Sequence, residues 1–403
     1  MKLIQPFAGW RPRPGLASEV AAPPYDVLSS QEARLLVKDH PHSFLYVSKA
    51  EIALDSALSP YDEQVYQTAA QRFDSLKEQG ILQQDSSPCL YIYQLTYKER
   101  VQTGVVAAAS IAAYRDNRIR KHELTRPDKE NDRTRLAEVL SAHSGPVFLI
   151  YRHAEPLDAL IQQIQNASPP DESFLADDGV HHALWVISDQ ALIAQLVELF
   201  EQQPRLYIAD GHHRSAAAAR VAERQPAADR FLAVIFPDKQ LQILDYNRVV
   251  KDLRGLSVTQ FLQAVQQHFH VAPAATAVAP KERHTFGLYV DKQWYQLSLE
   301  QKWIDESDPI ASLDVALLDR YLLQPILGIV DPRRDQRIDF IGGVRGTAAL
   351  QELVDGGSMA AAFSLCPTSL SELLAVADAG QIMPPKSTWF EPKLRDGLVV
   401  QTF

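Results

Sequence analysis

A strand, a polar turn and a helix follow one another over residues 206–223, and this succession constrains the fold more than any other stretch of the chain. Residues 206–209 form a short apolar run typical of a buried strand. Residues 216–223 are rich in strong helix formers. The polar run Asp-Gly-His-His-Arg-Ser at 210–215 lies between them. Its side chains are therefore predicted to lie where a strand passes into the start of a helix.

The chemistry of this run favours an anion as its ligand. The first turn of a helix has backbone N–H groups without helical partners and a partial positive charge. His212 and His213 could donate hydrogen bonds to a phosphate, and Arg214 could hold two of its oxygens. Gly211 would let the backbone approach the ligand closely, and Asp210 could bind Mg²⁺ or accept a proton. We interpret the run as a phosphate site; a polar turn with surface histidines and a histidine metal site are the alternatives.

A second polar run covers residues 120–133, around an expected strand end and a helix that begins at Pro127. Glu123 is the candidate general base for a hydroxyl group, and His122 is a candidate substrate contact. Lys129 and Arg133 are one helical turn apart and could face the same anion. The alternative is a solvated helix start with ordinary ion pairs.

Two stiff turns each follow a pair of prolines, which exclude a helix at those points. The first, at residues 22–27, presents Tyr25 as a candidate substrate contact and Asp26 as a second candidate acid or base. The other, at residues 383–390, presents Lys386, Ser387 and Thr388, which could contact nucleotide phosphates. Both turns could equally be ordinary surface turns.

Composition excludes several classes of protein. The chain has 403 residues, of which 46% are hydrophobic and 22% charged, so a sizeable core is expected and disorder is not. The net charge of −10 argues against a general affinity for nucleic acid. The two cysteines lie in no motif, and no secretory signal or membrane-spanning run is apparent. We therefore expect a cytoplasmic protein without a membrane partner.

A second pair of adjacent histidines, His181–His182, follows an Asp-Asp-Gly turn, and we expect this pair to be solvated.

The order of elements predicts a mixed fold. Strand-like runs at 90–95 and 104–113, joined by a polar turn, favour a hairpin, whereas other strands alternate with helices. This mixture predicts an α+β (mixed α/β) fold. We expect two regions: residues 1–251, which contain the Asp-Gly-His-His-Arg run, and residues 252–403, which contribute the Pro-Pro-Lys-Ser-Thr loop.

Four motifs, taken together and in order, resemble a bacterial and archaeal family catalogued as domain of unknown function 1015. They are Ala-Ala-Pro-Pro-Tyr-Asp-Val (21–27), the polar run from His122-Glu123 to Asp132-Arg133, Ile-Ala-Asp-Gly-His-His-Arg (208–214) and Met-Pro-Pro-Lys-Ser-Thr-Trp-Phe (383–390). The Asp-Gly-His-His-Arg run also resembles the phosphate-binding box of the ParB and sulfiredoxin superfamily, which an archaeal free-serine kinase shares.

This resemblance implies a ParB/sulfiredoxin-like core with an additional C-terminal α/β region. It implies a phosphotransferase acting on a hydroxyl, with free serine as acceptor or phosphoserine as donor, and with ATP or ADP and Mg²⁺. Phosphate contacts would come from Gly211, His212, His213 and Arg214, and Asp210 would hold the metal. A phosphoserine phosphatase and a ParB-like nucleotide- or nucleic-acid-binding module without catalysis are the alternatives. The oligomeric state is left open.

Overall fold

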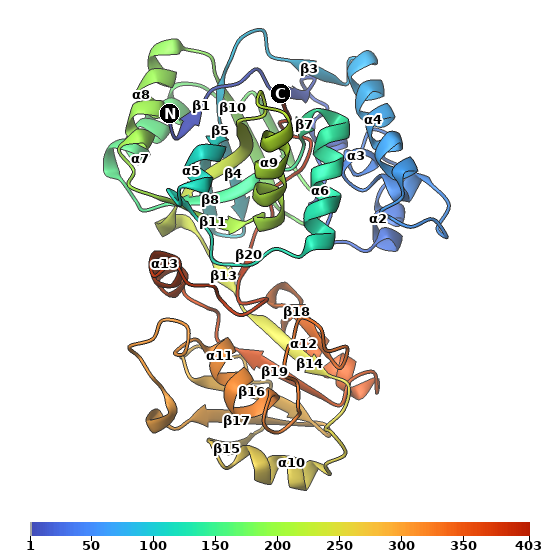
Figure 1. Ribbon diagram of the computed structural model, residues 1–403, viewed down its shortest axis with the longest axis vertical. Coiled ribbons are helices and arrows are strands. Elements are labelled where there is room, and N and C mark those ends of the chain that lie inside the picture. The colour runs from blue at the N-terminus through green and yellow to red at the C-terminus, as the bar shows by residue number, and fades with distance from the viewer. Residues whose placement is uncertain (1) are drawn as a thin grey trace. The chain divides into compact units, whose positions relative to one another are not determined.

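The computed structural model describes residues 2–403 and divides them into two compact units (Figure 1). The first unit contains the chain up to Lys121, Thr125–Leu241 and Pro392–Phe403. The second contains His122–Leu124 and Gln242–Glu391. We call Pro392–Phe403 the C-terminal strap. The division differs from the one expected at 251–252, because strand β14 (Tyr246–Val250) already pairs with strands β18 (Ile338–Gly342) and β19 (Ala361–Leu365) of the second unit.

A mixed sheet organises the first unit. Most neighbouring strands are antiparallel, but β8 pairs with β12 and β6 with β11 in parallel. The expected mixed α/β fold is thus confirmed, and so is the hairpin of β4 and β5. The sheet order is β6 (Ile119–Arg120), β11 (Leu206–Asp210), β8 (Val147–Tyr151), β12 (Arg230–Pro237), β5 (Arg100–Ser110), β4 (Leu90–Tyr97), β10 (His181–Ile187) and β9 (Glu172–Leu175), with β1 (Ile4–Gln5) on β5.

The two faces of this sheet are covered differently. Val105 and Ala107 of β5 belong to the core formed with α5 (Ile111–Arg115), α7 (Glu155–Ala167) and α8 (Gln190–Glu201). Side chains alternate along a strand, so Val106 faces the other way. There it lines a small cavity with Leu398 and Val399 of the C-terminal strap. The strap therefore covers the face of the sheet opposite to α7 and α8.

A helical layer forms a second core in the first unit. Its helices bury apolar side chains such as Phe73 and Leu136 against one another. Helix α6 begins with Pro127, as expected, and packs beside α9 (Figure 1). The elements of this layer and those beside it are α1 (Ala17–Val20), α2 (Ser30–Leu36), α3 (Leu45–Ser48), α4 (Glu63–Glu78), α6 (Pro127–Leu140), α9 (His212–Arg224), β2 (Trp10–Pro12), β3 (Leu82–Gln84), β7 (Ala142–His143) and β21 (Gln401–Thr402).

The prediction of a solvated His181–His182 pair is wrong. Both residues lie in β10, paired with β4 and β9. The Asp-Asp-Gly turn does form, but the strand begins directly after it, and the alternation of side chains turns His182 inward. His182 is 0% exposed and stacks between Tyr93 and Phe174.

An antiparallel sheet organises the second unit. Helix α12 covers one of its faces, where Leu350 packs against Val249 and Trp294. The sheet order is β15 (Phe269–Ala274), β17 (Gln293–Leu299), β16 (Thr285–Val290), β19 (Ala361–Leu365), β14 and β18 (Ile338–Gly342). The other elements are α10 (Val258–Val265), α11 (Asp314–Leu318), α12 (Gly346–Asp355), α13 (Leu370–Asp378) and the short pair β13 (Ile243–Leu244) and β20 (Trp389–Phe390).

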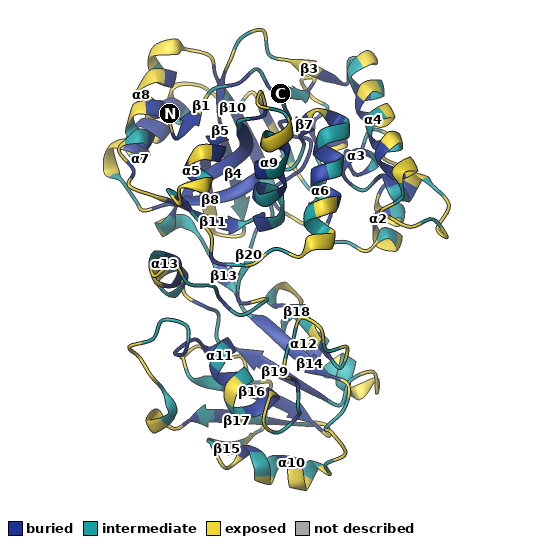
Figure 2. Cartoon of the chain, in the orientation of Figure 1, coloured by how far each residue is buried: buried dark blue, intermediate teal, exposed yellow. Residues whose placement is uncertain are grey.

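Burial follows this arrangement. Figure 2 shows the central strands of both sheets largely buried and many exposed residues on helix surfaces such as those of α4 and α8. Across residues 2–403, every helix falls short of the length or the apolar character that crossing a membrane requires.

Candidate functional site

The predicted strand, turn and helix form at the Asp-Gly-His-His-Arg run. Strand β11 ends at Asp210 and helix α9 begins at His212, so the motif itself makes the first helical turn, earlier than the expected start near residue 216. Gly211 joins the two elements with a φ of 95°, a left-handed conformation that favours glycine. Ser215 donates its backbone N–H to the Gly211 carbonyl and closes the turn.

The N-terminus of α9 lacks the side-chain cap that other helices of the chain have. Within residues 2–403, no side chain caps this helix, and its first turn carries no acidic residue. By contrast, α2, α10 and α13 each begin with a serine in a full capping box. A helix start of this kind has the partial positive charge that attracts anions, and here the Asp210 carboxylate accepts the Gly211 N–H.

Arg214 adds a full positive charge at the same place. A Cβ on Gly211 would lie 3.2 Å from Nε and 3.3 Å from Cζ of Arg214, so the side chain folds back over the start of α9. Its Nη1 donates to the carbonyl of Pro146, and its Nη2 lies 3.9 Å from Oδ2 of Asp210. The side chain is only 12% exposed. The guanidinium thus lies beside the helix terminus, and phosphate binding by the two together stays a prediction.

Asp210 is held as a carboxylate by cations around it. Its Oδ1 accepts the Gly211 N–H at 2.8 Å, and its Oδ2 accepts from Nζ of Lys393 at 3.2 Å. Burial raises the pKa of Asp210, but Lys393, Arg214 and the Gly211 N–H together lower it well below its usual value. Lys393 comes from the C-terminal strap.

These contacts bear on the metal role expected for Asp210. Both of its oxygens are engaged, and an ammonium already lies against one of them. A resident Mg²⁺ on this carboxylate would have to displace Lys393, so the arrangement does not fit a permanent metal ion. Metal binding by Asp210 stays a prediction.

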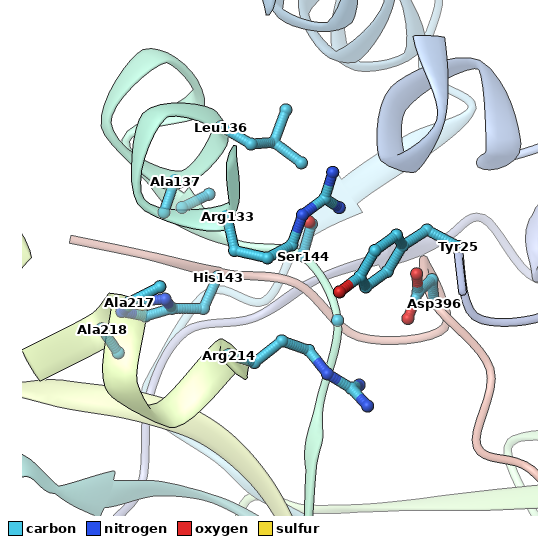
Figure 3. Close-up of a pocket in the computed structure, with 12 residues that line it drawn as sticks. Tyr25, Arg133, Leu136, Ala137, His143, Ser144, Arg214, Ala217, Ala218 and Asp396 are labelled. Atoms are coloured by element: carbon cyan, nitrogen blue, oxygen red, sulfur yellow. The ribbon is translucent and has the colours of Figure 1, made fainter. Parts of the chain in front are cut away.

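A pocket lies beside Arg214, between α6 and α9 (Figure 3). Its cavity volume is about 40 Å³, enough for a few water molecules. Leu136, Ala137, Ala217 and Ala218 form its apolar wall. The rest of the lining is Tyr25, Arg133, Ala142, His143, Ser144, Gly145, Arg214 and Asp396.

Arg133 and Tyr25 form one rigid corner of the pocket. Arg133 donates to Asp132 through Nε at 2.9 Å and to the Ser48 carbonyl through Nη1 at 3.1 Å. Its Cζ lies 3.8 Å from the centre of the Tyr25 ring, a cation–π contact that fixes the phenol. Burial and the charge of Asp26 raise the pKa of Tyr25, so its hydroxyl stays protonated.

Asp396 of the strap provides a carboxylate in the same pocket. It is 2% exposed, and its backbone exchanges two hydrogen bonds with Ala22, just before the diproline turn. Burial raises the pKa of Asp396 to about 7; Arg214 and Arg133 oppose the rise and Asp26 adds to it. His143, also in the lining, is neutral, because burial lowers its pKa to about 4.

The structure brings several predicted site residues together in the first unit and leaves others at its edge. Asp210, Gly211 and Arg214 share one location, and Arg214 shares the pocket with Tyr25 and Arg133. His212 is buried in the first turn of α9, directly after Gly211. The predicted residues at the edge are Asp26, which is exposed, His213, whose Nε2 accepts the Arg126 N–H at 3.0 Å, and Lys129, whose Nζ donates to the Tyr61 hydroxyl at 2.8 Å.

The other predicted residues belong to the second unit. The His122 carbonyl accepts the Met383 N–H at 2.8 Å, which joins the segment of His122 and Glu123 to the C-terminal diproline loop. In that loop Lys386 is exposed, with a φ of 57°. The hydroxyl of Ser387 donates to the Pro384 carbonyl at 2.6 Å. Thr388 is half-buried. Phosphate and substrate contacts by these residues stay predictions.

Sequence reasoning missed Lys393, Asp396, Ser144 and Gly145. The strap has no periodic pattern or motif that would set it apart from the second unit. Ser144 and Gly145 lie in the short link between β7 and β8, where a Ser-Gly pair indicates only a turn.

Comparisons with known proteins place this site in context. A model of the family described as "Protein of unknown function (DUF1015)" matches residues 4–316. Among curated proteins nothing matches the chain.

Solved structures resemble the chain only loosely. A free serine kinase in complex with AMP is 13% identical over 71% of this chain and 86% of its own, with a TM-score of 0.36. A conserved hypothetical protein from Pyrococcus furiosus is 13% identical over 76% and 97%, with a TM-score of 0.37. SbnI from Staphylococcus aureus, truncated at its C-terminus, is 11% identical over 72% and 85%, with a TM-score of 0.32. Because these TM-scores are below 0.5, we base no assignment on them.

Proposed function

The chain belongs to the DUF1015 family, and from the geometry of its site we propose that it is a phosphotransferase that moves a phosphoryl group from a nucleotide to the hydroxyl of a small molecule. In this reaction an oxygen–phosphorus bond forms on the acceptor, the bond to the leaving nucleotide breaks, and the acceptor hydroxyl loses its proton. Mg²⁺ would arrive with the nucleotide, as part of the substrate, because magnesium usually binds phosphates in this way.

One observation carries the proposal: Arg214 folds over Gly211 at the uncapped start of α9, directly beside a pocket. Phosphoryl transfer needs chiefly the positioning of the phosphate and the neutralisation of charge on its oxygens. The helix terminus and the Arg214 guanidinium supply both. The neighbouring pocket, with its Tyr25–Arg133 corner, would bind the acceptor.

The likeness of the Asp-Gly-His-His-Arg run to the box of free-serine kinases makes L-serine the first acceptor to try. His212 and His213 would add phosphate contacts from the same turn, and Lys393 would keep Asp210 ionised next to the transferred group.

The test is a transfer assay with the purified protein, L-serine, Mg²⁺ and either ATP or ADP, with phosphoserine measured by mass spectrometry. The reverse reaction starts from phosphoserine and the corresponding lower phosphate of the nucleoside. Formation of phosphoserine, or of the higher nucleotide in reverse, supports the proposal. Folded protein that turns over neither nucleotide in either direction refutes it, and release of phosphate from phosphoserine without nucleotide would favour a phosphatase.

A further inference from the structure

Asp396 and Arg214 meet at the loop that joins β7 to β8. A Cβ placed on Gly145 would lie 2.8 Å from Oδ1 of Asp396 and 3.4 Å from Cδ of Arg214. The carboxylate and the arginine therefore approach the same point on the pocket wall, and only glycine leaves room for them there. Figure 3 shows Asp396 beside Tyr25, with Arg214 on the neighbouring wall.

The segment that carries Asp396 is held firmly by its own contacts. Asp396 pairs through its backbone with Ala22, Val400 pairs with Trp10, and β21 pairs with β7. Arg395 adds a side-chain anchor to His182 at 3.2 Å. A carboxylate on such a segment is pre-positioned, as an acid or base in catalysis has to be.

The buried Asp396 carboxylate is incompletely hydrogen-bonded, although a side-chain hydrogen bond with Ser48 lowers its pKa. Among residues 2–403, no group donates a hydrogen bond to its buried Oδ1, and a buried acceptor without a partner is costly. The charged and titratable groups around it are Arg214 from α9, Arg133 from α6, Asp26 and Tyr25 from the diproline turn, and the neutral His143 from β7. A ligand that brings an O–H or N–H donor into the pocket would satisfy Oδ1.

We propose that this pocket is the acceptor subsite, and that Asp396 binds the acceptor's hydroxyl group and takes its proton; the proposal rests on the proposed phosphotransferase function. As the acceptor oxygen bonds to the transferred phosphorus, its proton moves to Asp396, and the nucleotide leaves with the electron pair of the broken phosphorus–oxygen bond. Arg214 lies between the two substrates and faces both the phosphate and the acceptor. The ligand class is a small hydroxylated compound with a polar backbone, such as a hydroxy amino acid.

A base with a pKa near 7 is suited to this task at neutral pH. Proton acceptance requires the ionised carboxylate, so the rate should fall as the pH drops below about 7. Tyr25 stays protonated in this range, so its hydroxyl can donate to the acceptor and help to orient it.

The test compares wild type with Asp396→Asn and Asp396→Glu, and with Asp178→Asn as a control that loosens the Arg395 anchor of the strap without entering the pocket. Each protein is assayed for transfer to L-serine across pH 5–9 and, by calorimetry, for binding of L-serine and of the nucleotide. We expect Asp396→Asn to lower kcat about 100-fold or more and to lose the acid limb of the pH profile. Nucleotide affinity should be unchanged, Asp396→Glu should recover part of the rate, and Asp178→Asn should behave as wild type.

The outcomes separate the two proposals. An active wild type together with an Asp396→Asn variant of near-normal kcat and an unaltered pH profile overturns the role of Asp396 and leaves the phosphotransferase function standing. A wild type that transfers nothing removes the function and, with it, the proton transfer. In that case L-serine binding that Asp396→Asn abolishes still assigns the pocket as its subsite, and an absence of serine binding overturns that as well.

Discussion

Two adjacent residues of the C-terminal strap, Arg395 and Asp396, are both buried in the first unit, but they differ in how fully their side chains are hydrogen-bonded. Arg395 donates to Nε2 of His182 and to the carboxylate of Asp178, and Nδ1 of His182 lies 2.7 Å from the Tyr93 hydroxyl. Every member of that cluster has a partner. Asp396, only 2% exposed, has none for its Oδ1 within residues 2–403.

The contrast distinguishes a polar cluster that holds a fold from one that is prepared for a ligand. Around Arg395, burial lowers the pKa of His182 to about 3, so the imidazole is neutral and accepts the Arg395 N–H. All members of the cluster have hydrogen-bond partners, so the cluster contributes to the stability of the fold. Asp396, whose Oδ1 accepts no hydrogen bond within residues 2–403, lines one pocket together with Arg214 and Tyr25. Such incomplete satisfaction is expected at functional sites.

The largest effect should come from Arg214, which lies in the pocket with Asp396. Arg214→Ala removes the guanidinium at the start of α9, and we expect kcat/KM for phosphoryl transfer to fall about 10²- to 10³-fold, as for the loss of one pre-organised donor to the transition state. Steady-state kinetics measure it. Arg220→Ala is the matched control, since Arg220 lies on the same helix but pairs with Glu130 and Asn131.

Thermal unfolding decides whether Arg214 has been interpreted correctly. Loss of the Arg214 side chain should leave the melting temperature close to that of Arg220→Ala. A large loss of stability with unchanged nucleotide affinity would mean that Arg214 has a structural role. The Asp396 pocket would then not differ in kind from the Arg395 cluster.

The next largest effect should come from the hydrogen-bonded cluster around Arg395. Arg395→Met leaves His182 and Asp178 without their donor, and we expect the free energy of unfolding to fall by about 2 to 3 kcal/mol. Urea denaturation measures this loss. The rate per folded molecule should stay close to wild type, because main-chain pairs hold the strap on both sides of the pocket. A stable but inactive Arg395→Met protein would contradict the division of roles.

A smaller effect concerns stability at high pH. Unfolded aspartate titrates near pH 4, whereas burial raises the pKa of Asp396 to about 7 in the folded chain. The wild type should therefore lose stability as the pH rises from about 4 to 7, because the folded state resists ionisation of this group. Asp396→Asn escapes that loss, so we expect it to be more stable than wild type at pH 8 and equal to it at pH 4.

Denaturation curves at both pH values check this. A variant that is less stable than wild type at pH 8 would mean that Asp396 is a structural ion-pair partner of Arg214, and the contrast with Arg395 would disappear.

The smallest effect should come from Gly145. A Cβ at this position would lie 2.8 Å from Oδ1 of Asp396, so Gly145→Ala should displace the carboxylate by a fraction of an ångström. We expect a decrease of about tenfold in kcat with little change in melting temperature. Kinetics and calorimetry on the same preparation measure both. A normal rate would show that the position of Asp396 is not critical.

The sequence predicts the part of this contrast that local pattern can encode. An apolar run, a glycine and a helix-forming run locate β11, Gly211 and α9, and they lead directly to Arg214. Pro127 locates the start of α6 and hence the neighbourhood of Arg133. These predictions succeed because the residues that decide each structure are neighbours along the chain.

The strap escapes prediction for the opposite reason. Lys393 and Asp396 acquire their roles from contacts with Asp210 and with the pocket, which lie far away in the sequence. The solvated loop expected at His181–His182 fails in the same way, since its burial depends on Tyr93 in β4 and on Arg395 in the strap.

The chain leaves the first unit at Leu241 and re-enters it at Pro392. Asp396 can therefore reach its place only after the whole intervening segment has been accommodated, and closing so long a loop is an entropically costly, late event in folding. The main sheet contains no residue of the returning segment, so it can be assembled before that event. Catalytic competence should accordingly be gained in a separate, final stage of maturation, after the regular secondary structure is complete.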